Sequence, residues 1–281
     1  MIEDGEYPAL LKETPWPPFG IYVRGVLPSR EDITLAIVGT RKATDEGKEI
    51  AEEFAFSLSK RGIRIVSGLA FGIDAAAHRG ALKARGITIA VLANGLDAFY
   101  PRSHEKLARE IIESGGAIVS EYPLGSPVLP YRFLERNRIV SGLSRGTLVV
   151  EAPKESGALT TVRFALEQNR DVFVVPGPAR HPNFAGSHSL IKSGAQLVTD
   201  PEDIIQTIAP EFLPGRPLFE MSSGENDEEE CVVNALREAK KPVSVDKIIE
   251  LTNLKPKNVN QVLTFLVLKG AVKESDGGYT V

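Results

Sequence analysis

The stretch LAIVGTRKATDEGKEIAEEFAFSLSKRGIRIVSG, residues 35–68, contains one complete unit of the fold. A short apolar run ends at Gly39, a helical pattern extends from about Glu46 to Lys60, and a second apolar run ends at Ser67. Strands that are apolar on both faces are typical of a parallel sheet covered by helices on both sides. We therefore expect a strand, a helix and a second, parallel strand here.

The same alternation of apolar runs and helical patterns continues to about residue 210. The later apolar runs are ITIAVL, AIVS, TLVV, DVFVV and AQLV. This repetition predicts an α/β fold, a doubly wound domain with a mainly parallel sheet. In such domains ligands bind at the carboxyl ends of the strands, so the loops that follow the strands are the candidate site.

Composition divides the chain into four parts. Residues 1–30 are rich in proline and aromatic residues, and we expect this lead-in to pack on the main domain, residues 31–210. Residues 211–226 contain proline, glycine, serine and acids, which predicts a linker. Residues 227–281 contain three helical patterns followed by a hairpin whose turn lies at SDGG, which predicts a winged-helix domain. The three helical patterns are residues 228–239, 244–253 and 255–270.

Charge and cysteine content exclude several classes of protein. The net charge of −4 argues against a protein that coats DNA with a uniformly basic surface, although a local basic groove is compatible with it. The single cysteine, Cys231, allows no internal disulfide and indicates the reducing cytoplasm. No apolar run is long enough for a membrane span, and the acidic N-terminus is no secretory signal. The four histidines lack metal-ligand spacing, so we expect no metal and no cofactor.

The first strand ends in VGTR, where Gly39, Thr40 and Arg41 precede a helix. A helix N-terminus supplies N–H donors and Arg41 a bidentate cation, so this loop is suited to a phosphate. The alternative is that Arg41 pairs with a surface carboxylate. The second loop begins with Ser67 and Gly68. Because the first loop is not GxGxxG and no acid closes the second strand, a dinucleotide cofactor is disfavoured.

Two further loops carry polar residues of interest. Asp74 and His78 lie four residues apart on one helix face, which predicts a contact between them. An enzyme would use them as an acid–base pair, but no Lys, Cys or metal-ligand cluster accompanies them, so a structural contact, or one that orients a phosphate, is favoured. Lys154, Ser156 and Gly157 follow a later strand, and small or hydroxyl residues of this kind form backbone nests for phosphate.

The segment YRFLERNRIVSGLSRG, residues 131–146, concentrates arginines in an otherwise acidic chain. Helical spacing places Arg132 near Arg136, with Phe133 alongside. Arginine forks next to an aromatic ring on which a base stacks predict a groove for single-stranded nucleic acid. In the alternative interpretation the arginines form ion pairs with nearby acids, namely Glu121, Glu135 or Glu151.

Several long motifs occur in a fixed order along the chain. They are VGTR (38–41), SGLAFGID (67–74), GLDAFYP (95–101), RNRIVSGLS (136–144), VVEA (149–152), SGALTT (156–161) and VPG (175–177). On these motifs the sequence resembles the DprA/Smf family of DNA-processing proteins, which act in bacterial natural transformation. The resemblance covers about residues 7–200, and the C-terminal unit is similar to the family's winged-helix domain.

This resemblance implies a Rossmann-like core that is not an enzyme. Such a core binds single-stranded DNA of any sequence, forms a homodimer and delivers the strand to the recombinase RecA. By the motifs, Arg41 grips a phosphate, Phe133 stacks a base and Lys154 lies on the pocket rim. The remaining motif residues, Arg136, Asn137 and Arg138, hold either the DNA backbone or the pocket itself together.

Two alternatives stay open. Related Rossmann-like enzymes that hydrolyse nucleoside monophosphates carry PGGxGTxxE, whereas the nearest stretch here, PGPARHPNFAGSHSL, lacks the paired glycines and the catalytic glutamate. In a nucleotide-sensing regulator, the winged helix reads duplex DNA through Lys255, Lys257 and Asn258 in the major groove. Residues 227–281 hold about as many acids as bases, which weakens duplex binding and favours a protein-docking or regulatory role.

Overall fold

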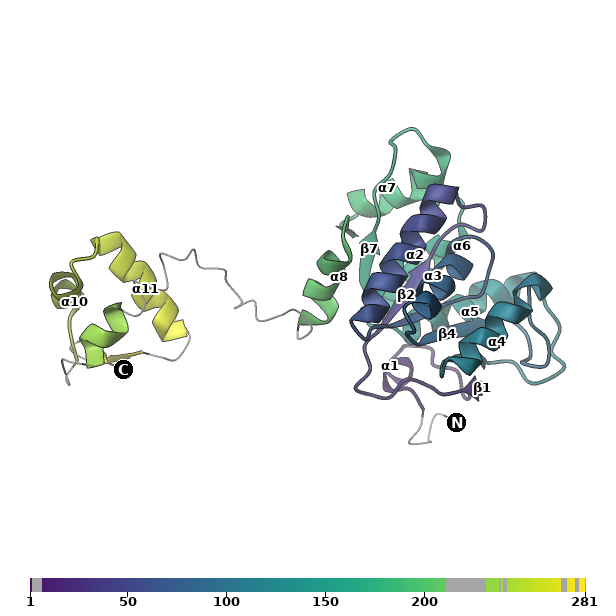
Figure 1. Cartoon of the computed structure of the whole chain (residues 1–281), viewed down its shortest axis with the longest axis horizontal. Coiled ribbons are helices and arrows are strands. Elements are labelled where there is room, and N and C mark those ends of the chain that lie inside the picture. The colour runs from purple at the N-terminus through teal and green to yellow at the C-terminus, as the bar shows by residue number, and fades with distance from the viewer. Residues whose placement is uncertain are drawn as a thin grey trace. The chain divides into compact units, whose positions relative to one another are not determined.

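The computed structural model of this chain describes residues 1, 7–210, 231–237, 239, 242–268, 272–275 and 278–280. The chain divides into two compact units, Met1–Leu213 and Pro214–Val281 (Figure 1). The predicted linker, residues 211–226, lies outside the described residues. Within the described parts, no helix combines the length and the apolar character that crossing a membrane requires.

A sheet of eight strands forms the centre of the first unit, in the order β1-β5-β4-β3-β2-β6-β7-β8 among the residues that the structure describes. Strands β2 to β8 are parallel, and β1 pairs with β5 in the antiparallel sense. The strand order reverses between β2 and β6, which makes this position the topological switch point. The strands are β1 (Tyr22–Gly25), β2 (Thr34–Val38), β3 (Arg64–Ser67), β4 (Thr88–Leu92), β5 (Ala117–Ser120), β6 (Gly146–Val149), β7 (Asp171–Val174) and β8 (Gln196–Leu197).

Helices cover both faces of this sheet. Residues of α2, α3 and α8 pack on one face, with α4 beside α3, and residues of α1, α5, α6 and α7 pack on the other. Figure 1 shows α2 and α3 side by side in front of the sheet. The helices are α1 (Ala9–Lys12), α2 (Asp45–Lys60), α3 (Ile73–Lys83), α4 (Glu105–Glu113), α5 (Pro130–Gly142), α6 (Gly157–Glu167), α7 (Ala185–Lys192) and α8 (Pro201–Ile208), with short 3-10 turns at Arg102–His104 and Pro182–Phe184.

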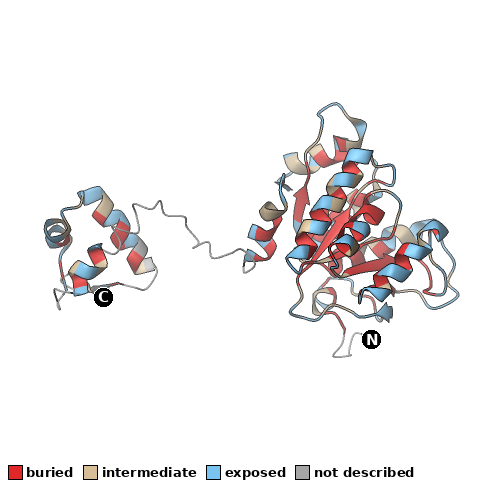
Figure 2. Cartoon of the chain, viewed as in Figure 1, coloured by how far each residue is buried: buried red, intermediate tan, exposed pale blue. Residues whose placement is uncertain are grey.

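Strand β2 shows why the central strands are apolar throughout. Leu35 and Ile37 belong to the core under α2, α3 and α8, whereas Ala36 and Val38 belong to the core under α5 and α6. All residues of β2 are buried, and the central strands form the buried centre of the unit in Figure 2. The predicted doubly wound, mainly parallel α/β fold is confirmed.

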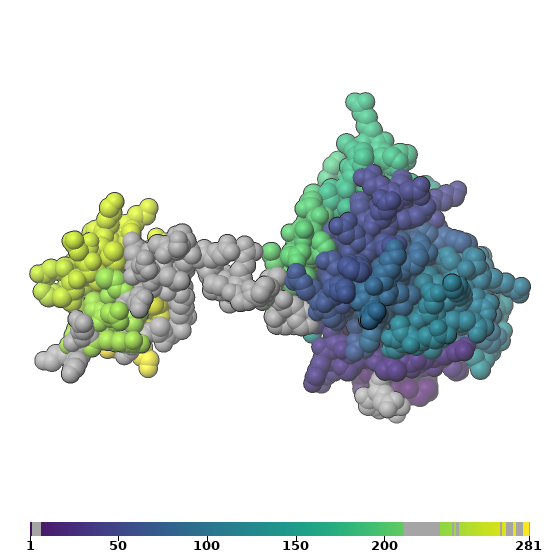
Figure 3. Space-filling view, in the orientation of Figure 1, coloured from purple at the N-terminus to yellow at the C-terminus, as the bar shows by residue number. Residues whose placement is uncertain are grey.

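The N-terminal lead-in lies along one edge of this unit, as the purple segment in Figure 3. Tyr7 and Leu11 are buried in the core next to α5, and the Tyr7 hydroxyl donates to the Pro18 carbonyl at 2.7 Å. Trp16 and Phe19 stay in solvent with exposed fractions of 74% and 72%. The lead-in therefore packs through part of its length and presents aromatic rings outward elsewhere.

The second unit has the winged-helix arrangement. Residues 231–237 are helical, and α10 (Val245–Thr252) and α11 (Pro256–Leu268) follow. Strands β9 (Lys273–Ser275) and β10 (Gly278–Thr280) pair in the antiparallel sense, and Val243 bridges to Tyr279. The predicted turn residues 276–277 lie outside the described residues. A separate apolar core, which includes Val232, Ile248, Val259, Leu263 and Val272, holds this unit together.

Candidate nucleic-acid interface

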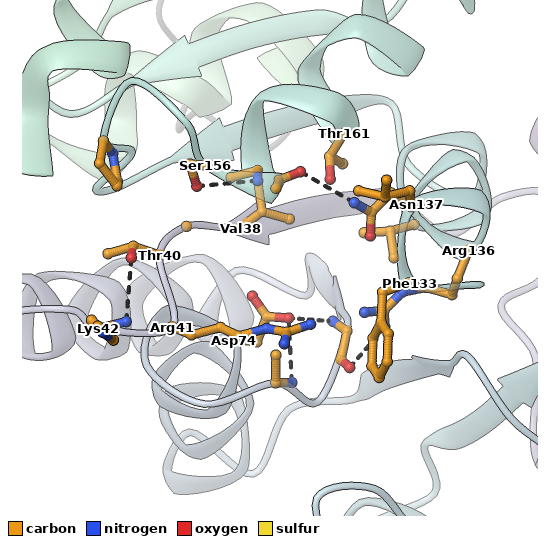
Figure 4. A pocket seen from close by; sticks show the side chains of 18 of the residues that line it. Val38, Thr40, Arg41, Lys42, Asp74, Phe133, Arg136, Asn137, Ser156 and Thr161 are labelled. Atoms are coloured by element: carbon orange, nitrogen blue, oxygen red, sulfur yellow. Dashed lines mark hydrogen bonds between the residues drawn. The ribbon is translucent and has the colours of Figure 1, made fainter. Parts of the chain in front are cut away.

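A cavity of about 380 Å³ opens at the switch point, between the loops that follow β2 and β6. One side is formed by residues 39–42, the opposite side by residues 153 and 155–158, and the end by α5 (Figure 4). A switch point leaves a crevice because the two flanking loops turn to opposite faces of the sheet. The predicted site residues that line the cavity are Gly39, Thr40, Arg41, Gly68, Phe133, Arg136, Asn137, Ser156 and Gly157.

Arg41 and Phe133 form a cation–aromatic pair within this cavity. The Arg41 guanidinium lies 4.8 Å from the centroid of the Phe133 ring, and Figure 4 shows it reaching from the β2 loop toward α5. Tyr100 contacts the same ring at 5.6 Å between centroids. Arg41 is exposed and Phe133 is half-buried. An exposed cation thus lies over a half-buried ring, and groups of these two kinds are suited to a phosphate and a base.

The loop that carries Arg41 is clamped by Glu151, at the end of β6. The buried Glu151 carboxylate accepts hydrogen bonds from Thr44 N at 3.1 Å, from the Thr44 hydroxyl, and from Asn183 Nδ2 at 2.8 Å. Thr44 in turn accepts from Gly47 N and caps α2. This corrects the prediction that the α2 N-terminus is open for a phosphate, because an internal carboxylate already occupies that positive helix end.

Arg136 lies in the cavity wall rather than in solvent. Its side chain is 3% exposed, and Nη1 donates to the carbonyls of Gly68, at 2.7 Å, and Val91. Burial lowers the pKa of Arg136 to about 10, so it stays charged at neutral pH. Of the two roles that the resemblance implies, its contacts support the one of holding the pocket together.

Asp74 is the buried acidic residue near Arg136. Its Oδ2 accepts from Gly68 N at 3.1 Å and from Ala70 N at 3.4 Å. Burial raises the pKa of Asp74, and the charge of Arg136 and these two N–H donors oppose that shift. Asp74 and Arg136 are thus buried at the base of the cavity, where the charge of Arg136 favours the ionised form of Asp74.

The predicted contact between Asp74 and His78 is wrong. His78 is fully buried on α3, and its Nδ1 lies 2.7 Å from the Thr88 hydroxyl. Asp74, one turn earlier, instead points to the β3 loop. The two side chains therefore do not form the acid–base pair that an enzyme would use.

The other arginines of residues 131–146 are engaged by the protein. Arg138 forms an ion pair with Glu121 at 2.6 Å, as in the alternative interpretation of this segment. Arg132 donates to the Pro127 carbonyl and lies 4.4 Å from the Tyr122 ring. The predicted proximity of Arg132 and Arg136 as a pair of phosphate forks is therefore wrong, because each guanidinium turns to a different internal partner.

The remaining predicted residues have different positions. Ser67 is buried and donates to the Ile37 carbonyl at 2.7 Å, which ties β3 to β2. Ser156 caps α6, and the Asn137 amide donates to Gly157 O at 3.2 Å. Lys154 is exposed between two residues that line the cavity, although it is not itself in the lining. Asn137, Ser156 and Gly157 thus belong to the cavity wall, Ser67 is buried outside the lining, and Lys154 lies at the rim. Contact with DNA stays a prediction for each of them.

Sequence reasoning missed three contributors. Lys42 is exposed and lines the cavity beside Arg41, Tyr100 supports Phe133, and Glu151 clamps the Arg41 loop. The signal for Glu151 was an acid directly after an apolar strand, in VVEA. Among the described residues, no group of three His, Cys, Asp or Glu side chains gathers where a metal ion could bind.

In the second unit, Lys255 and Lys257 are exposed at the start of α11 and Asn258 is half-buried. This is the helix end that enters the major groove in DNA-reading winged helices. The three predicted residues thus lie at or next to the first turn of α11, and their contact with duplex DNA stays a prediction.

The fold and cavity define a class: a Rossmann-like α/β protein with a cationic, ring-lined pocket at its switch point and a C-terminal winged helix. The family model of DNA recombination-mediator protein A matches residues 1–209, and that of the DprA winged helix domain matches residues 220–278. The chain therefore belongs to the DprA/Smf family of DNA-processing proteins.

Individual relatives agree with this assignment. Protein Smf of Escherichia coli K12 is 48% identical over 213 residues, which are 75% of this chain and 57% of that protein. DNA processing protein DprA of Streptococcus pneumoniae R6 is 40% identical over 204 residues, which are 73% of this chain and 72% of that protein. The chain spans about three-fifths of the length of the first curated relatives it matches.

Two solved structures are similar in fold. DprA from Streptococcus pneumoniae superposes with a TM-score of 0.68 at 38% identity, covering 73% of this chain and 72% of that chain. DprA from Helicobacter pylori, described for its single-stranded DNA binding mode, gives 0.65 at 30% identity, covering 73% and 93%.

Proposed function

We propose that this chain binds single-stranded DNA of any sequence in the switch-point cavity. The observation that carries the proposal is the Arg41 guanidinium over the accessible Phe133 ring, 4.8 Å away, at the cavity. The described binding mode of the Helicobacter pylori relative supports it.

Each part of the cavity has a chemical task in this function. The face of Phe133 receives a base, since every base offers a ring face for stacking. Arg41 and Lys42 attract the adjoining phosphates, and Lys154 extends the positive rim. Because neither a ring nor a phosphate distinguishes one nucleotide from another, binding by this arrangement is independent of sequence. The buried Arg136 keeps the β3 loop and α5 at the spacing that the base requires.

We further propose that the bound strand is handed to the recombinase RecA in the cytoplasm, by a homodimer of this chain, during natural transformation. The description of the family as a recombination mediator supports the transfer step. The chain acts as a binder rather than an enzyme. Asp74 is held by two N–H donors and a buried arginine, and His78 faces Thr88, so neither is poised as a general acid or base.

The test is a titration of a fluorescently labelled, 20-nucleotide oligo-dT and of a mixed-sequence strand of equal length. Phe133→Ala is expected to weaken binding of both by about 1–3 kcal/mol. Arg163 and Phe164 on α6 provide a matched control, because they form a similar pair at 5.3 Å and do not line the cavity. Equal affinities for wild type, Arg41→Ala and Phe133→Ala would refute the proposed site.

The recombinase step has its own measurement. RecA filament formation is followed on DNA coated with a single-strand-binding protein, with and without this chain. Acceleration that requires Arg41 supports loading, whereas tight DNA binding with no acceleration limits the function to strand binding. Release of free base from nucleotides, lost in Asp74→Ala, would instead favour the nucleotide-processing alternative.

A further inference from the structure

A second aromatic pair lies beside the cavity and is not used by the function proposed above. Phe71 is 48% exposed, and the His104 ring meets it edge-on, with centroids 4.9 Å apart and planes at 65°. His104 Nδ1 lies 2.9 Å from the Leu69 carbonyl, so it donates there and fixes the imidazole. An exposed ring is thus held in a defined orientation by an edge contact, which leaves its surface accessible.

The backbone places Phe71 next to the Arg41 loop. Ala70, immediately before Phe71, lines the cavity. Gly72, immediately after it, has φ of 75°, and a side chain there would collide with the Thr40 carbonyl and the Arg41 backbone. Phe71 is therefore the exposed residue of a turn that packs directly against the backbone of Thr40 and Arg41.

One chain segment connects this pair with the pair in the cavity. Tyr100 contacts Phe133, and His104, four residues later, contacts Phe71. Arg102 lies between them on the same segment and is exposed, with no ionic partner among the residues that the structure describes. Along this segment, one exposed cation thus stands between the residues that support the two rings, which is the order that a base, a phosphate and a second base would require.

We propose that Phe71, supported by His104, is a second stacking site, which receives a base of the same single strand next to the nucleotide in the cavity. Arg102 is the partner of a phosphate between the two. The inference rests on the proposed function and adds the path by which the strand leaves the cavity across the β3 loop. A continuous strand is favoured over a protein partner because the pair adjoins the cavity and an unpaired arginine accompanies it.

The experiment measures the affinity for labelled oligo-dT of 20 nucleotides over a range of salt concentrations. Phe71→Ala is expected to weaken binding about tenfold, the effect of losing one base–aromatic stack. The dependence on salt stays unchanged, because a ring releases no counterion. Arg102→Ala is expected to reduce the slope of log affinity against log salt by about 0.7. Phe71→Trp retains affinity, and the tryptophan fluorescence at position 71 is quenched by the oligonucleotide.

Two variants keep the result interpretable. Phe56→Ala is the matched control, because Phe56 is 40% exposed on α2 and does not line the cavity, and it is expected to bind as wild type. If Phe71→Ala does not fold, Phe71→Leu replaces it, since leucine keeps the apolar volume and removes the aromatic face. Thermal unfolding of each variant is measured alongside.

The outcomes separate this inference from the function on which it rests. If wild type binds oligo-dT and depends on Phe133, but Phe71→Ala binds equally well and Phe71→Trp shows no quenching, the second site is wrong and the first stands. If wild type binds no oligo-dT at all, the proposed function fails and the second site fails with it.

Discussion

The guanidinium of Arg136 occupies the space where a side chain on Gly68 would begin. Arg136 Nη1 donates to the Gly68 carbonyl at 2.7 Å, and a Cβ at position 68 would overlap the guanidinium. The contact joins the loop after β3 to helix α5, so that two walls of the cavity share one buried cation. The φ of Gly68 is not in the left-handed region. Position 68 therefore requires glycine for lack of space and not for its backbone conformation.

Gly68→Ala is expected to lower the free energy of unfolding by about 1–3 kcal/mol, the cost of overpacking a close-packed site. Gly157→Ala is the control, since Gly157 also lines the cavity but a Cβ there meets nothing within 4 Å. Its effect is expected within about 0.5 kcal/mol. Urea unfolding measures both, and equal losses would contradict the packing argument.

Substitution of Arg136 is expected to lower the stability of the fold, whereas substitution of Arg41 is expected to weaken DNA binding at nearly unchanged stability. Arg136→Met leaves the buried carbonyls of Gly68 and Val91 without their donor, so the free energy of unfolding falls by about 1–3 kcal/mol. Arg41→Ala, at an exposed site, changes stability by about 0.5 kcal/mol or less. It reduces the slope of log affinity against log salt by about 0.7, as for one phosphate of a single strand. A large loss of stability in Arg41→Ala would show that this cation is structural instead.

His78 is expected to make the fold sensitive to acid. The Thr88 hydroxyl donates to the Ile65 carbonyl, so His78 Nδ1 must donate to Thr88 and the bare Nε2 has no partner. Burial lowers the pKa of His78 to about 3. The unfolded chain, with an ordinary histidine pKa, therefore binds the extra proton between about pH 6.5 and pH 3.

The contribution of neutral, buried His78 to the free energy of unfolding is complete above about pH 6.5. It is lost as the pH falls below that value, by up to about 1.4 kcal/mol per pH unit. Urea unfolding of wild type and His78→Gln at pH 7 and pH 5 isolates it, since carboxylates contribute equally to both proteins. The difference in stability between the two proteins is expected to shrink at pH 5, and a constant difference would contradict the assignment.

Glu151 is expected to control the Arg41 loop. Glu151→Gln replaces one acceptor oxygen by an NH₂ group, so either the Thr44 hydroxyl or the N–H groups of Thr44 and Asn183 lose their acceptor, and the free energy of unfolding falls by about 1–3 kcal/mol. Affinity for oligo-dT falls as well, because Arg41 loses its fixed position. Asn183→Ala keeps the contacts of Glu151 with Thr44 and is expected to have a smaller effect. Unchanged affinity in a destabilised Glu151→Gln would limit the residue to a structural role.

The second unit is expected to be dispensable for single-strand binding. The first unit has its own core, so a chain of residues 1–213 is expected to fold and to bind oligo-dT within about threefold of the full chain. A joint change of Lys255 and Lys257 to alanine tests duplex binding in the full chain. Loss of duplex affinity there would favour the regulator, and no loss would favour a protein-docking role.

The fold followed from local patterns in the sequence. Continuously apolar strands such as Thr34–Val38 indicate burial on both faces, and their alternation with amphipathic helices leaves few topologies other than a doubly wound sheet. The same topology places the loops after β2, β3 and β6 at one edge. That is why residues far apart in the chain, such as Arg41 and Gly157, could be assigned to one site beforehand.

Which arginines are free was decided only by the tertiary structure. From sequence, Arg136 and Arg138 were as suited to a phosphate as Arg41, because the sequence shows an acidic partner for none of the three. Arg136 meets the Gly68 carbonyl 68 residues away, and Arg138 meets Glu121 across the preceding loop. The state of a cation depends on partners and burial contributed by distant segments, and local spacing along the chain contains neither.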